Sequence, residues 1–188
     1  KTEKSLQHPN IQHIFMPAFR QPPPNMLAYG HGYSLNTILL RPKSTGSVII
    51  KSANPSEAPI IDLNMLDATE DLEALVGAIK TSRQILSSSE FSHLKPNEFR
   101  PGPEVQTDED WKEYIRANAQ TVYHPVGTCK MGVGEDAVVD SNLRVRGLRN
   151  LRVIDASIMP RIVGGNTNAP TIMIAEKGAD IIKKTLTH

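Results

Sequence analysis

Apolar side chains recur at helical spacing along one stretch in the first half of the chain. The positions are Leu72, Leu75, Val76, Ile79, Ile85 and Leu86. This spacing is typical of a helix with one buried face. Asp67 and Glu70 precede the run at the spacing of a capping box. The pattern therefore predicts a helix over residues 68–87.

Two more helices are predicted further along the chain. Thr107 followed by Asp110 is a second start signal, and it precedes apolar residues that share one helical face. This predicts a shorter helix over residues 108–119. Beyond Pro170, the run TIMIAEKGADIIKKTL again has helical periodicity. It predicts a third helix that begins directly after GGNTNAP.

Short runs rich in β-branched and aromatic residues indicate strands. The runs are FMPAF (residues 15–19), YSLNTILL (33–40), SVIIKS (47–52), Leu143–Val145 and Leu151–Ile154. A turn over residues 43–46 separates the second run from the third, so we expect these two runs to pair as a hairpin.

The order of these elements decides the fold class. Strands, two helices, a loop, further strands and a final helix are typical of an α+β fold. We expect a mainly antiparallel sheet covered by helices. No G-x-G-x-x-G motif opens a βαβ unit anywhere in the sequence. The chain therefore has no dinucleotide-binding domain of its own.

Composition excludes several classes of protein. The 188 residues suit one ordinary domain, and 21 Lys and Arg against 20 Asp and Glu leave a net charge of +1. Without a block of like charge, nucleic acid and anionic membrane surfaces are not indicated as partners. No apolar run approaches the roughly 18 residues of a membrane span, and the start KTEKSLQHPN lacks the apolar core of a signal peptide. We expect a soluble protein, with the cytoplasm favoured, although a signal upstream of Lys1 would not be visible.

The loop TVYHPVGTCKMG (residues 121–132) concentrates candidate chemistry. Pro125 stiffens the link to His124, which suits a catalytic base that must stay within hydrogen-bond reach of its substrate. The plainer alternative is a partly buried histidine beside a turn. Cys129 invites a thiol-enzyme hypothesis, but a free cysteine is usually a small buried hydrophobe. As the only cysteine, it also excludes a disulfide within the chain and a metal site built from Cys pairs.

The segment SIMPRIVGGNTNAPT (residues 157–171) is a second candidate. Gly164 and Gly165 permit close backbone approach, and three polar residues, Asn166, Thr167 and Asn168, stand just before the predicted third helix. The exposed N–H groups and positive dipole end of a helix attract anions or electron-rich oxygens. A simple helix cap without any ligand is the alternative.

Three blocks of sequence carry a resemblance to a known family. They are YHPVGTCKMG, VVDSNLRVRGLRNLRVIDASIMP and GGNTNAPTIMIAEKGADII. In wording, order and spacing they are similar to the C-terminal part of glucose-methanol-choline (GMC) oxidoreductases, and most of all to choline-dehydrogenase-like members. The upstream text from PNIQHIFMP to PIIDLNML also resembles that family's substrate-domain sheet. The resemblance covers nearly the whole chain.

The resemblance implies an FAD-dependent enzyme that oxidises the CH–OH group of a small-molecule alcohol. His124 would accept the hydroxyl proton while hydride passes to flavin N5, and Asn166 would position the substrate oxygen. Implied cofactor contacts are Asp155, Ala156, Thr167, Asn168, Tyr123 and Pro125. An Asn can donate a hydrogen bond without changing charge, which leaves proton uptake to the histidine.

The resemblance also implies a division of the chain and a missing partner. Residues 1–120 would form part of the substrate-binding domain, and residues 121–188 the catalytic-His segment with FAD-contacting strands and helix. Full-length members begin with a Rossmann-type FAD domain, so this one would have to be supplied in cis or in trans, and the isolated chain is expected to be inactive. The competing hypothesis is a non-catalytic fragment or binding domain. The identity of the alcohol and of the electron acceptor stays open, with His31 and Tyr33 expected in the pocket wall.

Overall fold

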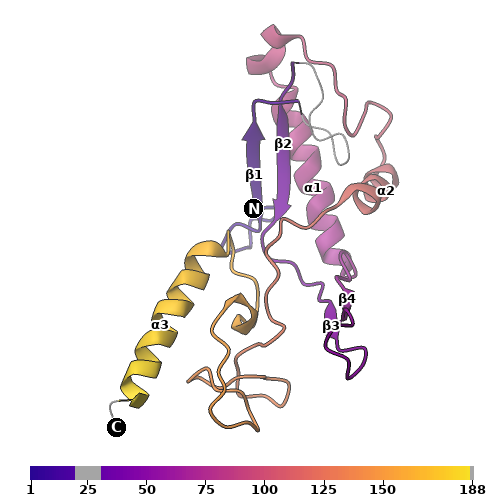
Figure 1. Ribbon diagram of the computed structural model, residues 1–188. Coiled ribbons are helices and arrows are strands. Elements are labelled where there is room, and N and C mark those ends of the chain that lie inside the picture. The colour runs from indigo at the N-terminus through magenta and orange to yellow at the C-terminus, as the bar shows by residue number, and fades with distance from the viewer. Residues whose placement is uncertain (20–30, 187–188) are drawn as a thin grey trace. The chain divides into compact units, whose positions relative to one another are not determined.

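The computed structural model describes residues 1–19 and 31–186. The chain divides into two compact units. Unit 1 consists of Lys1–Thr45 and Met65–Gln120, and unit 2 of Gly46–Asn64 and Thr121–His188. The elements of both are labelled in Figure 1.

Unit 1 is built from a hairpin and two α-helices. Strands β1 (Ile11–Met16) and β2 (Ser34–Leu39) pair antiparallel. Helix α1 (Thr69–Leu86) packs against both strands and against α2 (Asp108–Asn118). Figure 1 shows the two strands side by side with α1 next to them. A 3₁₀ helix, η1 (Ser89–Leu94), follows α1.

The core of unit 1 lies between α1 and α2. Trp111 is 2% exposed and packs with four other buried residues, Leu72, Val76, Val105 and Ile115. The guanidinium carbon of Arg83 lies 4.2 Å from the centroid of the indole ring. The same guanidinium donates to the carbonyl oxygens of Gly102 and Val105 at 2.9 and 2.6 Å. The loop before α2 is thus tied to α1 by hydrogen bonds as well as by apolar contact.

The N-terminal ends of the two helices are stabilised differently. Thr107 and Asp110 form the expected capping box at the start of α2. The capping box expected at Asp67 and Glu70 is wrong, because α1 has Ala68 as its N-cap residue, without a side-chain cap. The buried carboxylate of Asp71, in the first turn of α1, instead binds the segment that contains Lys43 and Ser44. It accepts hydrogen bonds from the backbone N–H groups of Lys43 and Ser44 and from the Ser44 hydroxyl.

Unit 2 contains a short hairpin, a long looping segment and one helix. Strands β3 (Ser47–Ile49) and β4 (Ile60–Asp62) pair antiparallel. The 3₁₀ helix η2 (Ala156–Ile158) and helix α3 (Asn168–Leu186) follow the loop. Isolated bridges join Met131 to Val139, Val139 to Val145 and Arg144 to Arg152. The core of this unit is formed by Val139, Leu143, Ile158, Met159 and Ile174.

The fold class α+β is confirmed, and so are the three predicted helices. The strand pairing is not. Residues 33–40 and 47–52 do not form a hairpin, since β2 pairs with β1 and β3 pairs with β4. Within the described ranges the strands form two separate two-stranded sheets. Residues 143–145 and 151–154 form no strands and are joined to each other by a single bridge, Arg144 to Arg152. Leu143 has a left-handed φ of 63°, which interrupts extended backbone.

One boundary between the compact units lies after residue 120. Residues 46–64 group with the C-terminal segment and not with the first 120 residues. No helix in the described ranges is long and apolar enough to cross a bilayer.

Candidate active site

All eight residues expected at the site belong to unit 2. They occupy three segments: the loop after α2, the start of η2 and the start of α3. The residues are Tyr123, His124, Pro125, Asp155, Ala156, Asn166, Thr167 and Asn168. The same core is contacted by Val126 of the loop, by Ala156 of η2 and by Ile174 in the second turn of α3. The structure therefore gathers the three segments around one cluster of apolar side chains.

Backbone hydrogen bonds hold the His124 loop against η2. The N–H of Cys129 donates to the carbonyl of Ser157 at 3.0 Å, and the N–H of Met131 donates to that of Ile158 at 2.8 Å. Gly127 turns the chain with φ of +93°, a conformation that favours glycine. A Cβ atom at this position would also touch the carbonyl oxygen of Met159, 3.4 Å away. Cys129 and Met131, which directly follow the HPVGT sequence, thus clamp the loop to η2.

Tyr123 stands out in this loop because of its backbone and its exposure. Its φ of 63° lies in the left-handed region, where a bulky residue costs of order 1–3 kcal/mol. Its N–H donates to the Thr121 hydroxyl at 3.0 Å, and its side chain is 82% exposed. Residues with strained backbone are frequent at active sites and ligand-binding sites.

His124 is half-buried and its neighbour Pro125 is exposed. In the parts of the chain that the structure describes, no hydrogen bond reaches the His124 ring and none joins it to Asn166.

Asp155 and Ala156 form the start of η2. One carboxylate oxygen of Asp155 accepts from the Ser157 N–H at 2.8 Å and from its hydroxyl at 2.5 Å. This is the N-cap of η2. Ala156 is half-buried against the core. Asp155 thus has a structural task that the sequence did not reveal. Its second oxygen accepts no hydrogen bond from the residues that the structure describes.

The start of α3 alternates exposed and buried polar residues. Asn166 and Asn168 are exposed, whereas Thr167 is only 9% exposed. The Thr167 carbonyl accepts from the N–H of Thr171 at 3.0 Å and from its hydroxyl at 2.7 Å. Asn168 and Ala169 begin the helix, so their N–H groups have no acceptor within it. The positive end of the dipole therefore carries two amide side chains and two backbone donors.

Comparison with known proteins decides the family. The model of the GMC oxidoreductase family matches residues 42–175. The chain belongs to the GMC oxidoreductases. It is 47% identical over 97% of its length to an alcohol dehydrogenase [acceptor] of Pseudomonas putida, of which it covers 33%. It is 42% identical, again over 97%, to 33% of an oxygen-dependent choline dehydrogenase of Escherichia coli O127:H6.

Solved structures agree with this assignment. An FAD-dependent oxidoreductase from Chaetomium thermophilum aligns with a TM-score of 0.76 and 30% identity, over 86% of this chain and 28% of that one. The chain thus corresponds to the C-terminal third of its GMC relatives.

The other histidine and tyrosine expected near the site belong to unit 1. His31 is exposed. Tyr33 packs against Phe91 and Phe15, with ring centroids 5.2 and 6.0 Å apart. Its buried hydroxyl has no hydrogen-bond partner in the described part of this GMC chain.

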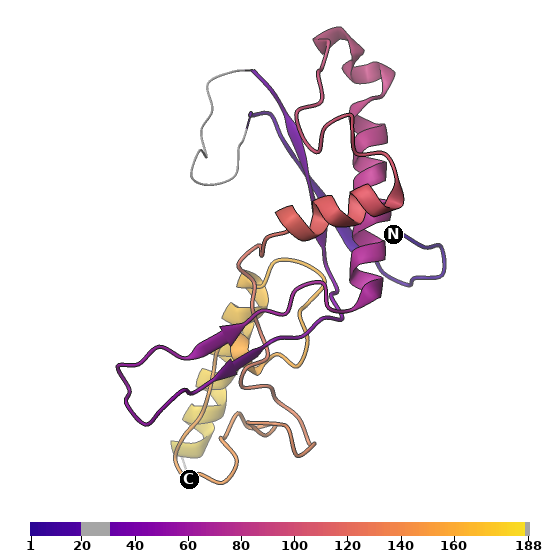
Figure 2. The ribbon, with the colours of Figure 1, turned by 90° about the vertical axis from the view of Figure 1, so that its right-hand side faces the viewer.

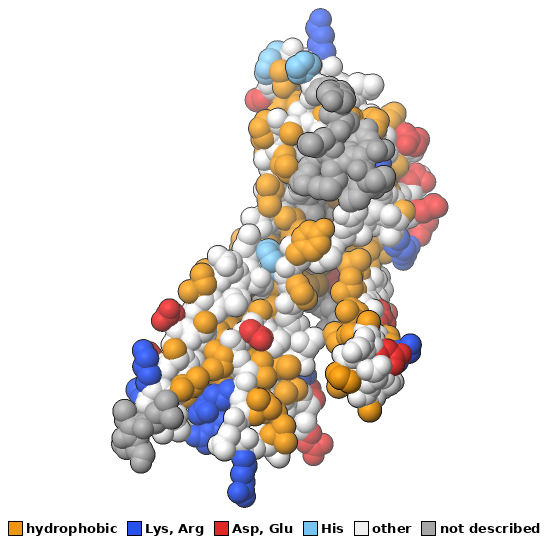
Figure 3. Space-filling model, viewed as in Figure 1, with side chains coloured by type: hydrophobic (Ala, Val, Ile, Leu, Met, Phe, Trp, Pro, Cys, Tyr) orange, Lys and Arg blue, Asp and Glu red, His pale blue; other side chains and the backbone are white. Residues whose placement is uncertain are grey.

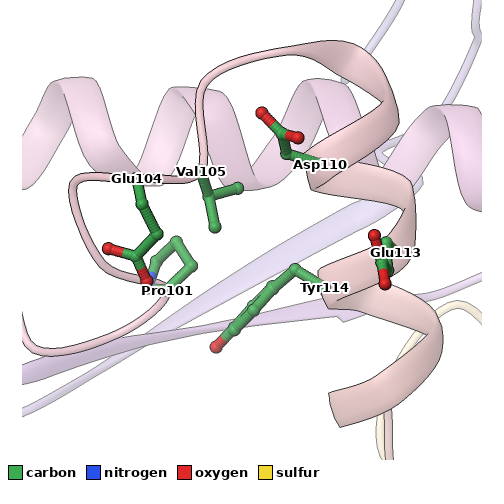
Figure 4. A pocket seen from close by; sticks show the side chains of 6 residues that line it. All are labelled: Pro101, Glu104, Val105, Asp110, Glu113 and Tyr114. Carbon is green, nitrogen blue, oxygen red and sulfur yellow. The ribbon is translucent and has the colours of Figure 1, made fainter.

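One open pocket lies in unit 1, away from all eight site residues in sequence. Figure 4 shows Pro101, Glu104 and Val105 of the loop facing Asp110, Glu113 and Tyr114 of α2. The Asp110 carboxylate is already engaged by the backbone N–H groups of Gln106 and Thr107. This pocket therefore has none of the groups by which the GMC resemblance defines a catalytic site.

Proposed function

We propose that this chain is the C-terminal segment of an FAD-dependent oxidoreductase that oxidises the CH–OH group of an alcohol. An upstream FAD-binding domain, in cis or in trans, completes it. The observation that carries the proposal is the clamp between the HPVGT loop and η2, which fixes the segment bearing His124 to the core that also holds the start of α3. The names of the two relatives, an alcohol dehydrogenase and a choline dehydrogenase, support an alcohol as substrate.

The donors at the start of α3 fit the flavin part of FAD. Asn166 and Asn168 are exposed there beside the unbonded N–H groups of the first helical turn. Such groups at the positive end of a helix stabilise electron-rich ring oxygens and the negative charge that develops on them. Tyr123 and Pro125, both exposed, and the free oxygen of Asp155 are the remaining contacts that we assign. The pyrophosphate contacts would come from the upstream domain.

His124 is the proton acceptor in this proposal. Its ring nitrogen takes the proton of the alcohol hydroxyl as the C–H bond breaks, which leaves the oxygen able to form the carbonyl. FAD, when bound, supplies the acceptor for the hydride that leaves the carbon. The clamp through Cys129 and Met131 restrains the loop, so that the ring stays within reach of the hydroxyl.

Asn166 positions the substrate oxygen. Its side-chain amide donates a hydrogen bond to this oxygen and stays uncharged throughout the reaction. In this proposal, unit 1 belongs to the substrate-binding domain of the family.

Substitution in a completed enzyme tests the proposal. This chain is joined to the upstream two thirds of the Pseudomonas putida relative, and alcohol oxidation is measured. We expect His124→Gln to lower kcat by about 10²–10⁴-fold, the contribution of a general base. Cys129→Ser serves as the matched control in the same loop, because it keeps the backbone N–H that bonds Ser157.

The outcome separates this mechanism from a thiol enzyme. A variant with Cys129→Ser that loses activity as strongly as His124→Gln would contradict the assignment of the base. Far-UV circular dichroism of both variants establishes that the fold is retained.

A further inference from the structure

The β3–β4 hairpin has apolar side chains on both of its faces. The register places Val48 opposite Ile61 and Ile49 opposite Ile60. Because successive residues of a strand point to opposite faces, these two pairs lie on opposite sides of the hairpin. Continuous apolar runs of this kind are typical of strands that are buried on both faces.

Both faces expose apolar side chains. Val48 and Ile61 are 50% and 63% exposed, and Ile49 and Ile60 are 53% and 51% exposed. Just beyond the strands, Ile50 and Leu63 are also exposed. None of these six residues, which we call the hairpin surface, belongs to the apolar core of either unit. Figure 2 shows the hairpin as an extended arm, and Figure 3 shows hydrophobic side chains on the surface in this region.

Physical chemistry argues that the hairpin surface is buried in the working protein. An isolated two-stranded hairpin is at best marginally stable in water. Its open edges would also pair with other strands unless they are covered. The polar turn is different in character, since Lys51 and Glu57 form an ion pair there at 2.7 Å. The strands, and not the turn, are therefore the part that requires a partner.

We propose that the hairpin surface is the docking site for the upstream two thirds of a GMC chain, in cis or in trans. The inference rests on the proposed function, because that function requires the upstream part. The relatives are about three times as long as this chain, which covers 33% of each. A larger partner can cover both faces at once. A second copy that docks on one face leaves the other face exposed.

Co-expression of the two segments tests the docking site. This chain is produced with the affinity-tagged upstream two thirds of the Pseudomonas putida relative, and their dissociation constant is measured by analytical ultracentrifugation. Ile49→Lys and Ile61→Lys place a charge on one face each, and we expect each to weaken association at least about tenfold, as burial of an unpaired charge requires. Val133→Lys is the matched control, since Val133 lies in unit 2, outside the hairpin, and is 98% exposed.

Three outcomes overturn the docking site. In the first, both hairpin variants associate with wild-type affinity. In the second, the wild-type segments do not associate at all. In the third, this chain alone forms a dimer, and the hairpin variants dissociate that dimer. Because the hairpin surface lies outside both cores, each variant chain is expected to keep the wild-type circular dichroism spectrum.

Flavin content and alcohol oxidation of the same complex separate this inference from the proposed function. A complex that the hairpin variants weaken, but that holds no flavin and oxidises no alcohol, supports the docking site and contradicts the function. An active complex that tolerates both variants contradicts only the docking site.

Discussion

Units 1 and 2 differ in how much of the apolar surface of each is buried by its own residues. Unit 1 surrounds Trp111 with two helices and ties its loops to them through Arg83 and Asp71. Unit 2 builds its core from looping backbone and isolated bridges and leaves apolar side chains exposed on both faces of its hairpin. All eight residues expected to act in catalysis or to contact the cofactor lie in unit 2. This difference agrees with our proposal, in which unit 2 holds the catalytic residues and is completed by an upstream domain.

The largest effect is expected in the core of unit 1. Trp111→Ala removes a side chain that is 2% exposed, and such a change costs about 3–5 kcal/mol in the free energy of unfolding. Urea denaturation followed by circular dichroism measures it. Leu94→Ala, at a 52% exposed position of η1, is the control and should stay within about 0.5 kcal/mol of wild type. Equal losses in the two variants would contradict a closed core in unit 1.

The second largest effect is expected from the hydrogen bonds that the Asp71 carboxylate accepts from Lys43 and Ser44. Asp71→Ala leaves the donors of Lys43 and Ser44 without their carboxylate, and a lost hydrogen bond to a charged group costs about 1.5–3 kcal/mol. The exposed Glu73 on the same helix provides the control Glu73→Ala. Hydrogen exchange of α1 should increase in the first variant only. If exchange is unchanged in both, these hydrogen bonds do not stabilise unit 1.

Two glycines allow a direct comparison of the units. Gly77 of α1 has open space around the position of a Cβ atom, whereas a Cβ at Gly178 of α3 would overlap Ile154. Gly77→Ala should stabilise unit 1 by about 0.5–1 kcal/mol through helix propensity. Gly178→Ala should destabilise unit 2 by about 1–2 kcal/mol through overpacking, net of that gain. Thermal denaturation of the two variants shows whether the signs are opposite, and stabilisation by both would show that α3 is not packed on Ile154.

The smallest effect is a pH dependence in unit 1. Burial, assisted by the positive N-terminus, lowers the pKa of His13 below its ordinary value of 6.5. The folded state then binds fewer protons than the unfolded state, so stability is greatest above pH 6.5 and falls as the pH drops toward the lowered pKa. His13→Gln should flatten this slope in denaturation curves between pH 7 and pH 5. The exposed His93 gives the control His93→Gln, and a slope unchanged by His13→Gln would contradict the assignment.

The helices could be predicted from sequence because their signals are local. The periodicity of α1, α2 and α3 and the capping box at Thr107 each lie within one or two turns. The capping box expected at Asp67 does not form, since Ala68 is the N-cap residue. The start of α1 is instead bonded through Asp71 to Lys43 and Ser44, residues distant in sequence. No local pattern carries that contact.

Strand pairing and site geometry depended on distant residues as well. Of the run SVIIKS, Ser47–Ile49 form a strand as predicted. This strand pairs with β4, beyond the polar turn, and not with the preceding strand β2. The motif around His124 identified this loop as a candidate site. The hydrogen bonds from the loop to Ser157 and Ile158, and the cap that Asp155 forms on η2, are visible only in the structure. Gly127, between His124 and Cys129, was the available sequence signal for that tight turn.

The most direct test of the account is the visible absorbance of this chain, alone and co-purified with the upstream two thirds of the Pseudomonas putida relative, before and after a primary alcohol is added without oxygen. We predict flavin bands that bleach in the complex, and a colourless protein when the chain is alone. A complex that forms but stays colourless, or whose flavin bands persist with every alcohol tried, would contradict the claim that this chain carries the catalytic half of an FAD-dependent alcohol oxidoreductase.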